Sequence, residues 1–134
     1  MQIGRTYKRP GKHTPSFFDG VDGASASVSF DCGSCRTRIN LDLVTFLGAA
    51  SNWESQFSTA ELDELRKKIK FPTREIELPD STKTLVKSHE GGSPFLSIVE
   101  CNCCSHKHLI YIGYYEFQPS RYIGTLQGVY EAIT

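Results

Sequence analysis

Apolar and polar residues alternate along two separate parts of the chain, and a pair of cysteines interrupts each alternation. In the first part, apolar side chains fall on every second position over residues 25–30 and again over 39–43. In the second part, a short strand-like run over 95–99 is followed by a longer one over 108–115. A period of two is typical of β-strands. The pattern therefore predicts two β-hairpins, each with cysteines in its turn.

The segment between these hairpins, about 46–93, is predicted to be an insertion that contains one helix. Residues 51–54 and 58–61 both match the capping box, in which a hydroxyl and a carboxylate satisfy amides at a helix start. After the second box, apolar residues recur at helical spacing and acidic residues precede basic ones by four positions. We therefore expect a helix at about 59–70. An alternating stretch at 75–78 predicts an edge strand.

The first 20 residues are polar and are interrupted by prolines and glycines, so they are predicted to form an irregular arm. The arm is the one clearly basic segment of the chain. It is interpreted either as a solvated tail or as a contact for an acidic partner. The basic residues that precede its first acidic residue, Asp19, are Arg5, Lys8, Arg9 and Lys12.

The last residues, 120–134, carry apolar side chains near helical spacing, with two glycines among them. A C-terminal helix is therefore expected. Together these elements predict the α+β class, with an antiparallel sheet made of the two cysteine-bearing hairpins, one inserted helix and the C-terminal helix. Residues 21–134 are expected to form a single domain, because a chain of this length supports one hydrophobic core.

Composition narrows the classes of function without choosing one. The chain has 134 residues, of which 39% are hydrophobic and 22% charged, and its formal net charge is zero. A neutral balance weighs against non-specific binding along a phosphate backbone, although it leaves room for a local basic patch. The sequence shows neither a secretory signal nor a run long enough to span a bilayer, so a cytoplasmic protein without membrane contact is expected.

The chain contains five cysteines, and four of them form two pairs with a spacing of three residues. These pairs are Cys32 with Cys35 and Cys101 with Cys104. Thiols in a reducing cytoplasm bind metal more often than they form disulfides, and an odd number suits four ligands and one spare. Two such turns supply the four thiolates of a tetrahedral zinc site. Since four thiolates leave no open position, the zinc ion is predicted to be structural.

Several alternatives remain open within this site. Cys103 is an alternative to Cys104, and His106 or His108 is an alternative to either cysteine of the second pair. The spacing favours Cys101 with Cys104, because both thiolates then point into the turn. An iron–sulfur cluster uses the same four ligands as zinc, and sequence does not separate the two.

The two cysteine turns resemble the knuckles of the zinc-ribbon family. The matching motifs are Phe30-Asp-Cys-Gly-Ser-Cys35 and Val99-Glu-Cys-Asn-Cys-Cys104, each flanked by predicted strands and separated by the long insertion. Neither motif has the usual glycine after its second cysteine, because Arg36 and Ser105 stand there. The resemblance implies a fold module held by zinc. Ribbons serve DNA, RNA, protein partners or stability alone, so the resemblance does not assign a function.

No catalytic residue is predicted, because the chain lacks the motifs of common hydrolases, metalloproteases and nucleotide-binding enzymes. Our first hypothesis is therefore a non-enzymatic, zinc-stabilised domain that binds a protein, of the kind represented by immunity proteins and antitoxins that neutralise a toxin. The alternative is a nucleic-acid-binding zinc ribbon that uses Arg36, Arg38 and the basic arm.

Overall fold

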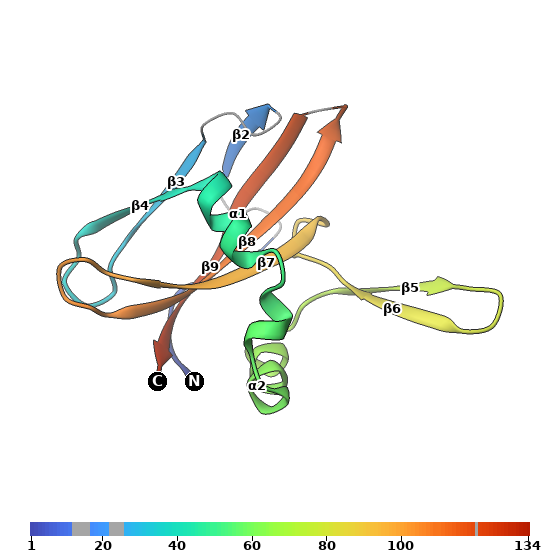
Figure 1. Cartoon of the computed structure of the whole chain (residues 1–134), viewed down its shortest axis with the longest axis horizontal. Coiled ribbons are helices and arrows are strands. Elements are labelled where there is room, and N and C mark those ends of the chain that lie inside the picture. Colours follow the sequence, from blue (N-terminus) through green and yellow to red (C-terminus); the bar gives the residue numbers. More distant parts are fainter. Residues whose placement is uncertain (12–16, 22–25, 120) are drawn as a thin grey trace.

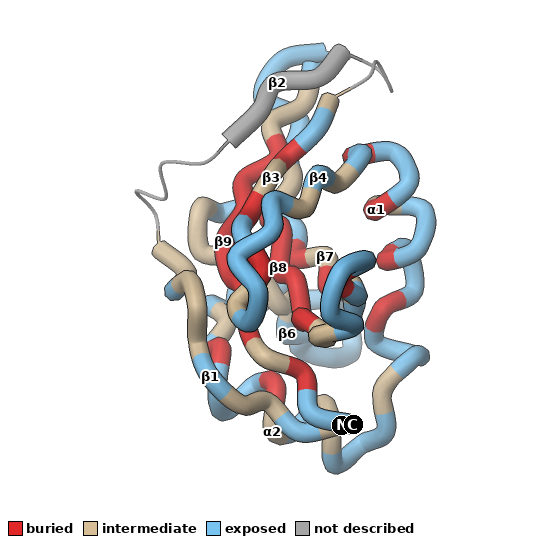
Figure 2. The backbone as a smooth tube through the Cα atoms, turned by 90° about the vertical axis from the view of Figure 1, so that its left-hand side faces the viewer, coloured by how far each residue is buried: buried red, intermediate tan, exposed pale blue. Residues whose placement is uncertain are grey.

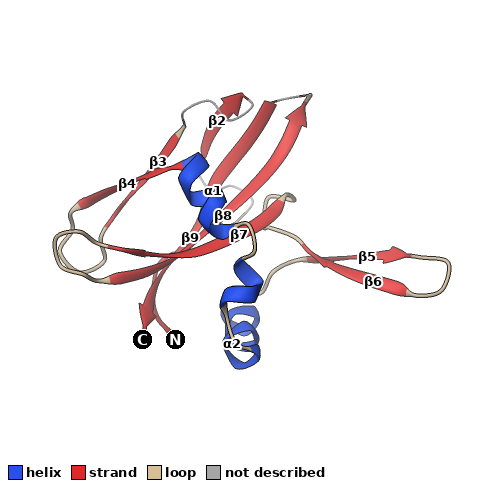
Figure 3. Cartoon of the chain, viewed as in Figure 1, coloured by secondary structure: helices blue, strands red, loops and turns tan. Residues whose placement is uncertain are grey.

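The computed structural model describes the whole chain apart from residues 12–16, 22–25 and 120. The described residues form mostly antiparallel strands together with two α-helices, so the protein belongs to the α+β class, as predicted (Figure 3). None of the helices found in these residues is long and apolar enough to cross a membrane.

The largest sheet has five strands and is antiparallel throughout (Figure 1). Its central strand β8 lies between β7 and β9, and the far edge of β9 pairs with β2 near its start and with β1 near its end. The strands are β1 (Gln2–Lys8), β2 (Phe17–Val21), β7 (Ser93–Glu100), β8 (Lys107–Gln118) and β9 (Arg121–Ile133).

Two smaller sheets have two strands each. One is the hairpin of β3 (Ser27–Asp31) and β4 (Arg38–Asp42), which contains the first cysteine pair in its turn. The other is the hairpin of β5 (Thr73–Glu77) and β6 (Thr82–Val86), which projects away from the rest of the molecule (Figure 1). The cysteine-bearing hairpins therefore belong to different sheets, whereas the sequence analysis placed them in one.

The C-terminal helix predicted for residues 120–134 is wrong, because this segment forms strand β9. A spacing of four residues, as between Tyr122, Leu126 and Tyr130, is twice the two-residue repeat of a strand and is also close to one turn of a helix. The glycines weaken the helix, and β8 offers a long row of backbone partners. At Gly128 a side chain would overlap the Tyr130 ring, which lies 2.6 Å from the position of an added Cβ.

The irregular arm predicted for residues 1–20 is also wrong in the part that the structure describes. Residues 2–8 form β1 and residues 17–21 form β2, and both pair with β9. Their partner residues lie 100 or more positions away in the chain, so no local pattern predicts the pairing. Lys12, a basic residue of the predicted arm, lies outside the described residues.

The predicted helix at 59–70 is confirmed as α2 (Thr59–Ile69), and its capping box between Ser58 and Glu61 is present. The box predicted at 51–54 is wrong. Ser51 instead ends an unpredicted helix, α1 (Leu43–Ala50), and its hydroxyl donates to the Gly48 carbonyl. A short 3-10 helix, η1 (Trp53–Gln56), follows without a side-chain cap.

One hydrophobic core joins these elements (Figure 2). Its centre is β8, where Leu109, Ile110, Tyr111 and Ile112 are completely buried. The first cysteine-bearing hairpin reaches this core through Val28 and Phe30, and the two α-helices contribute the residues Phe46, Ala50, Leu65 and Ile69. The core thus fixes the strands that lead into the cysteine turns.

Candidate metal centre

The turns of β3–β4 and β7–β8 meet at one end of the molecule and bring four thiols together (Figure 1). The Sγ atoms of Cys32, Cys35, Cys101 and Cys104 all lie within 4.8 Å of one another. Two contacts cross between the turns: Cys32 to Cys104 at 3.5 Å and Cys35 to Cys101 at 3.6 Å. All four side chains are free thiols in the structure. We call the turns 32–38 and 101–107 the first and second knuckle.

The two knuckles have the same backbone hydrogen bonds. In each, the first cysteine donates its N–H to the carbonyl five positions later, at 2.9 Å in both cases. Its own carbonyl accepts from the N–H four positions later, at 3.1 Å in the first knuckle and 2.9 Å in the second. Residues at equivalent places can therefore be matched. Cys103 corresponds to Ser34, Asn102 to Gly33, and His106 to Thr37.

The residue after the second cysteine has a left-handed backbone in both knuckles. Its φ angle is 64° at Arg36 and 61° at Ser105. Glycine adopts this region freely, whereas a residue with a Cβ is disfavoured there by about 1–2 kcal/mol. The turns thus have the shape for which zinc ribbons use glycine, although neither has one, and the rest of each knuckle holds the strained residue in place.

Hydrogen bonds to sulfur prepare the site for thiolates. The second cysteine of each knuckle accepts the backbone N–H two positions later, from Thr37 to Cys35 and from His106 to Cys104. The side chain and backbone of Thr37 lower the pKa of Cys35 to about 6. At Cys104 the His106 N–H also lowers the thiol pKa. Desolvation and the neighbouring thiols outweigh this effect and raise the pKa of Cys104 to about 11. Four adjacent thiolates therefore need a cation among them.

The four thiols are half enclosed. The first cysteine of each knuckle, Cys32 or Cys101, is buried, with 0% and 2% of its surface exposed. The second, Cys35 or Cys104, is exposed. An ion held by these sulfurs would rest against the protein on one side and remain open to a chelator on the other.

The structure gives the histidines near the second knuckle other partners. His108 is buried, and its Nε2 accepts from the Gly33 N–H at 3.1 Å. Its Nδ1 then donates to the Val99 carbonyl at 3.3 Å, which fixes the tautomer and uses both nitrogens. Burial lowers the pKa of His108 and favours its neutral form.

The Nε2 of His106 is 2.8 Å from the Tyr7 hydroxyl. Cys103 is exposed and does not belong to the group of four thiols.

Tyr7 is a residue of this site that sequence reasoning missed. It extends from β1 and reaches both knuckles, since its hydroxyl meets His106 and its ring covers Gly33. A Cβ added to Gly33 would lie 2.1 Å from that ring, so the contact requires glycine there. Burial and the Glu131 carboxylate raise the pKa of Tyr7, while Arg5 and Arg36 oppose the shift. The segment predicted as an arm is thus attached to the thiol cluster.

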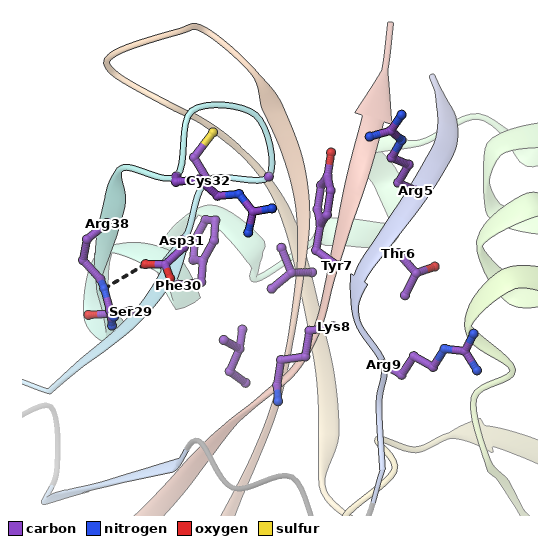
Figure 4. Close-up of a pocket in the computed structure, with 14 residues that line it drawn as sticks. Arg5, Thr6, Tyr7, Lys8, Arg9, Ser29, Phe30, Asp31, Cys32 and Arg38 are labelled. Carbon is purple, nitrogen blue, oxygen red and sulfur yellow. Dashed lines mark ion pairs between the residues drawn. The ribbon is translucent and has the colours of Figure 1, made fainter.

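Beside the first knuckle lies a cleft of about 840 Å³ between β1, the β3–β4 hairpin and β9 (Figure 4). The structure brings together here Arg36, Arg38 and part of the basic N-terminal segment, the residues named above for a nucleic-acid contact. Within the part of the chain that the structure describes, the only acidic residue of the lining is Asp31, which forms an ion pair with Arg38 at 3.0 Å. The basic residues that line the cleft are Arg5, Lys8, Arg9, Arg36 and Arg38.

Comparison with protein-family models, with curated proteins and with solved structures finds no match to this chain. The site is therefore interpreted from its own geometry.

Proposed function

We propose that this protein is a non-enzymatic binding domain stabilised by a structural zinc ion at Cys32, Cys35, Cys101 and Cys104. The observation that supports this most strongly is the convergence of four thiols from two equivalent knuckles. A tetrahedral zinc ion with Zn–S bonds of about 2.3 Å places its sulfurs about 3.8 Å apart. The sulfur–sulfur contacts of 3.5 and 3.6 Å, and the 4.8 Å limit on all pairs, match a single ion with little movement.

The same distances favour one ion over an iron–sulfur cluster. A cluster contains several iron and sulfide ions, so its cysteine sulfurs are held farther apart than the sulfurs around a single ion. Sulfurs that lie within 4.8 Å of one another leave room for a single ion. Because the four thiolates fill all positions of a tetrahedral ion, no place is left for a substrate or a reactive water, which supports a structural role.

The metal would join distant parts of the chain directly, in addition to the Gly33–His108 hydrogen bond and the contacts of Tyr7. The sulfurs in contact belong to residues 66 and 72 positions apart, and they lie in two different sheets. A two-stranded hairpin is marginally stable by itself, so β3–β4 gains most from a link to the larger sheet. That link also holds the wall of the basic cleft next to β1.

Metal analysis of the purified chain tests this function. We expect one zinc ion per chain, and loss of that ion on Cys101→Ser or Cys32→Ser. Cys103→Ser is the matched control, because it removes an exposed thiol from the same knuckle and leaves the four ligands. Retention of stoichiometric zinc in both ligand variants, or loss of zinc in the control, would contradict the assignment of ligands.

A protein partner, including a toxin neutralised by an immunity-type protein, is a second candidate for what the domain binds. The projecting β5–β6 hairpin favours it, because all five residues of β5 are exposed and Ile76 and Leu78 present apolar surface there. Replacing Ile76 and Leu78 by Ser and testing capture of partner proteins examines this candidate. Capture unchanged by the replacement would remove it.

A further inference from the structure

The cleft beside the first knuckle concentrates positive charge in a chain of zero net charge. Of the described residues that line it, five are basic and only Asp31 is acidic. Among the described residues, the only ion pair of these five is that between Arg38 and Asp31. An excess of positive charge gathered in a concave surface attracts and concentrates anions.

The basic groups approach the cleft from two walls. Arg5 and Lys8 come from β1, and Arg36 comes from the first knuckle next to the ligand Cys35. Figure 4 shows Tyr7 and Lys8 extending from β1 on the side that faces the β3–β4 hairpin, whereas Arg9 extends to the other side of the strand. Arg5 and Arg36 both line the cleft, and the Glu131 carboxylate, which accepts from the Arg5 N–H at 3.0 Å, offsets part of their charge.

From this arrangement we infer that the cleft binds a single strand of nucleic acid through its phosphates, an inference that rests on the proposed binding domain and names its partner. Among the described residues, three cations face the cleft without an ion pair (Figure 4), and two of these, Arg5 and Arg36, are arginines, whose planar fork matches phosphate oxygens. The volume of about 840 Å³ exceeds what one phosphate fills and lies at the upper end of ordinary ligand pockets, about 300–1,000 Å³.

The shape of the surface selects a single strand over a duplex. Proteins that recognise a duplex insert a protruding helix or ribbon into a groove. Here the charge lines a hollow, which suits a flexible strand that enters it. The half-buried aromatic ring of Tyr7 also lines the cleft, next to the cations, whereas Phe30, Leu126 and Val129 beneath it are almost completely buried. Nucleotides offer flat apolar bases beside their phosphates, whereas acidic side chains offer charge alone.

Binding to the zinc-loaded chain tests the inference directly. The probes are fluorescein-labelled 12-residue oligothymidylate and oligouridylate, measured by anisotropy between about 50 and 200 mM salt. We expect binding whose logarithm falls with log salt at a slope of about −2, because each phosphate neutralised on a single strand contributes about −0.7 and Arg5, Lys8 and Arg36 can each neutralise one. The comparison probes are a duplex of equal length and polyglutamate of equal charge.

Arg36→Gly is the decisive variant, because glycine suits the left-handed backbone at this position and the fold should survive. We expect affinity for oligothymidylate to fall about tenfold, and the salt slope to become shallower by about 0.7. Arg74→Ala on the projecting hairpin removes the same charge far from the cleft and should leave affinity unchanged.

The outcomes separate this inference from the proposed function. Absence of binding by zinc-loaded chain, an equal effect of both arginine variants, or preference for the duplex would each overturn the inference and leave the zinc domain standing. Tighter binding of polyglutamate would assign the cleft to an acidic protein and would also overturn it. Failure of the chain to hold zinc would instead contradict the proposed function.

Discussion

The two knuckles have the same backbone and differ in what surrounds them. The second ends the β7–β8 pair of the five-stranded sheet, whereas the first belongs to the small β3–β4 sheet. The first is covered by Tyr7 at Gly33 and lines the basic cleft, while the equivalent residue of the second, Asn102, is exposed. One turn geometry thus serves two purposes. The second knuckle anchors the metal to the core, and the first presents a surface that the metal holds in place.

Removal of the metal should produce the largest difference between the two knuckles. Structural zinc contributes about 10 kcal/mol or more in finger peptides, so we expect chelation to lower the melting temperature by more than about 10 °C. Hydrogen exchange should then rise far more in β3–β4 than in β7–β8, because only the second pair is built into the larger sheet. Equal exchange in the two hairpins after chelation would contradict the different roles assigned to the knuckles.

Alanine at two equivalent positions of the knuckles, Gly33 and Asn102, sharpens the comparison. Gly33→Ala should destabilise the protein by about 1–3 kcal/mol, because its Cβ overlaps the Tyr7 ring. Asn102→Ala, at the exposed equivalent, should change the free energy of unfolding by less than about 0.5 kcal/mol. Denaturant unfolding measures both. A neutral Gly33→Ala variant would mean that Tyr7 does not hold β1 against the knuckle.

Relief of backbone strain should have nearly the same effect in both knuckles. Arg36→Gly and Ser105→Gly each replace a left-handed residue with the one that adopts this conformation freely. The gain is at most about 1 kcal/mol, because glycine also increases the entropy of the unfolded chain. Thermal unfolding of the zinc-loaded variants measures it. A clear loss of stability at either position would show that the side chain itself supports the turn.

The smallest expected effect concerns the charged pairs that flank the turns. Asp31 lies opposite Arg38 and Glu100 lies opposite Lys107, so each knuckle follows the same acid–base pairing between its strands. The Asp31–Arg38 pair is exposed, and such pairs contribute little. Asp31→Asn is expected to change the free energy of unfolding by less than about 0.5 kcal/mol in a denaturant titration. A larger loss would indicate that this pair positions the wall of the cleft.

The sequence predicts the local features of the site better than its long-range ones. The cysteine spacing, the strands beside each turn and helix α2 follow from patterns within a few residues, where turn geometry and capping act. Helix α1 was missed because its sequence, LVTFLGAA, is nearly all apolar and has no helical period to detect. Its start is marked only by Asp42, whose side chain accepts from the Thr45 N–H.

Features that depend on distant segments were out of reach. Strand β1 exists because β9 offers an edge at the opposite end of the chain, and Tyr7 meets His106 across 99 positions. The basic residues of the N-terminal segment and Arg36 were each visible in the sequence, but only the fold brings them to one cleft. The missing glycines also gave a misleading signal, because the turns adopt the left-handed conformation without them.

X-ray absorption at the zinc edge of the purified chain tests the central claim most directly. The account predicts one zinc ion per chain with four sulfur neighbours at about 2.3 Å and no nitrogen or oxygen neighbour. The Cys103→Ser variant should give the same spectrum. A shell containing nitrogen, or a short metal–metal distance, would contradict the four-cysteine site and the structural role assigned to its ion.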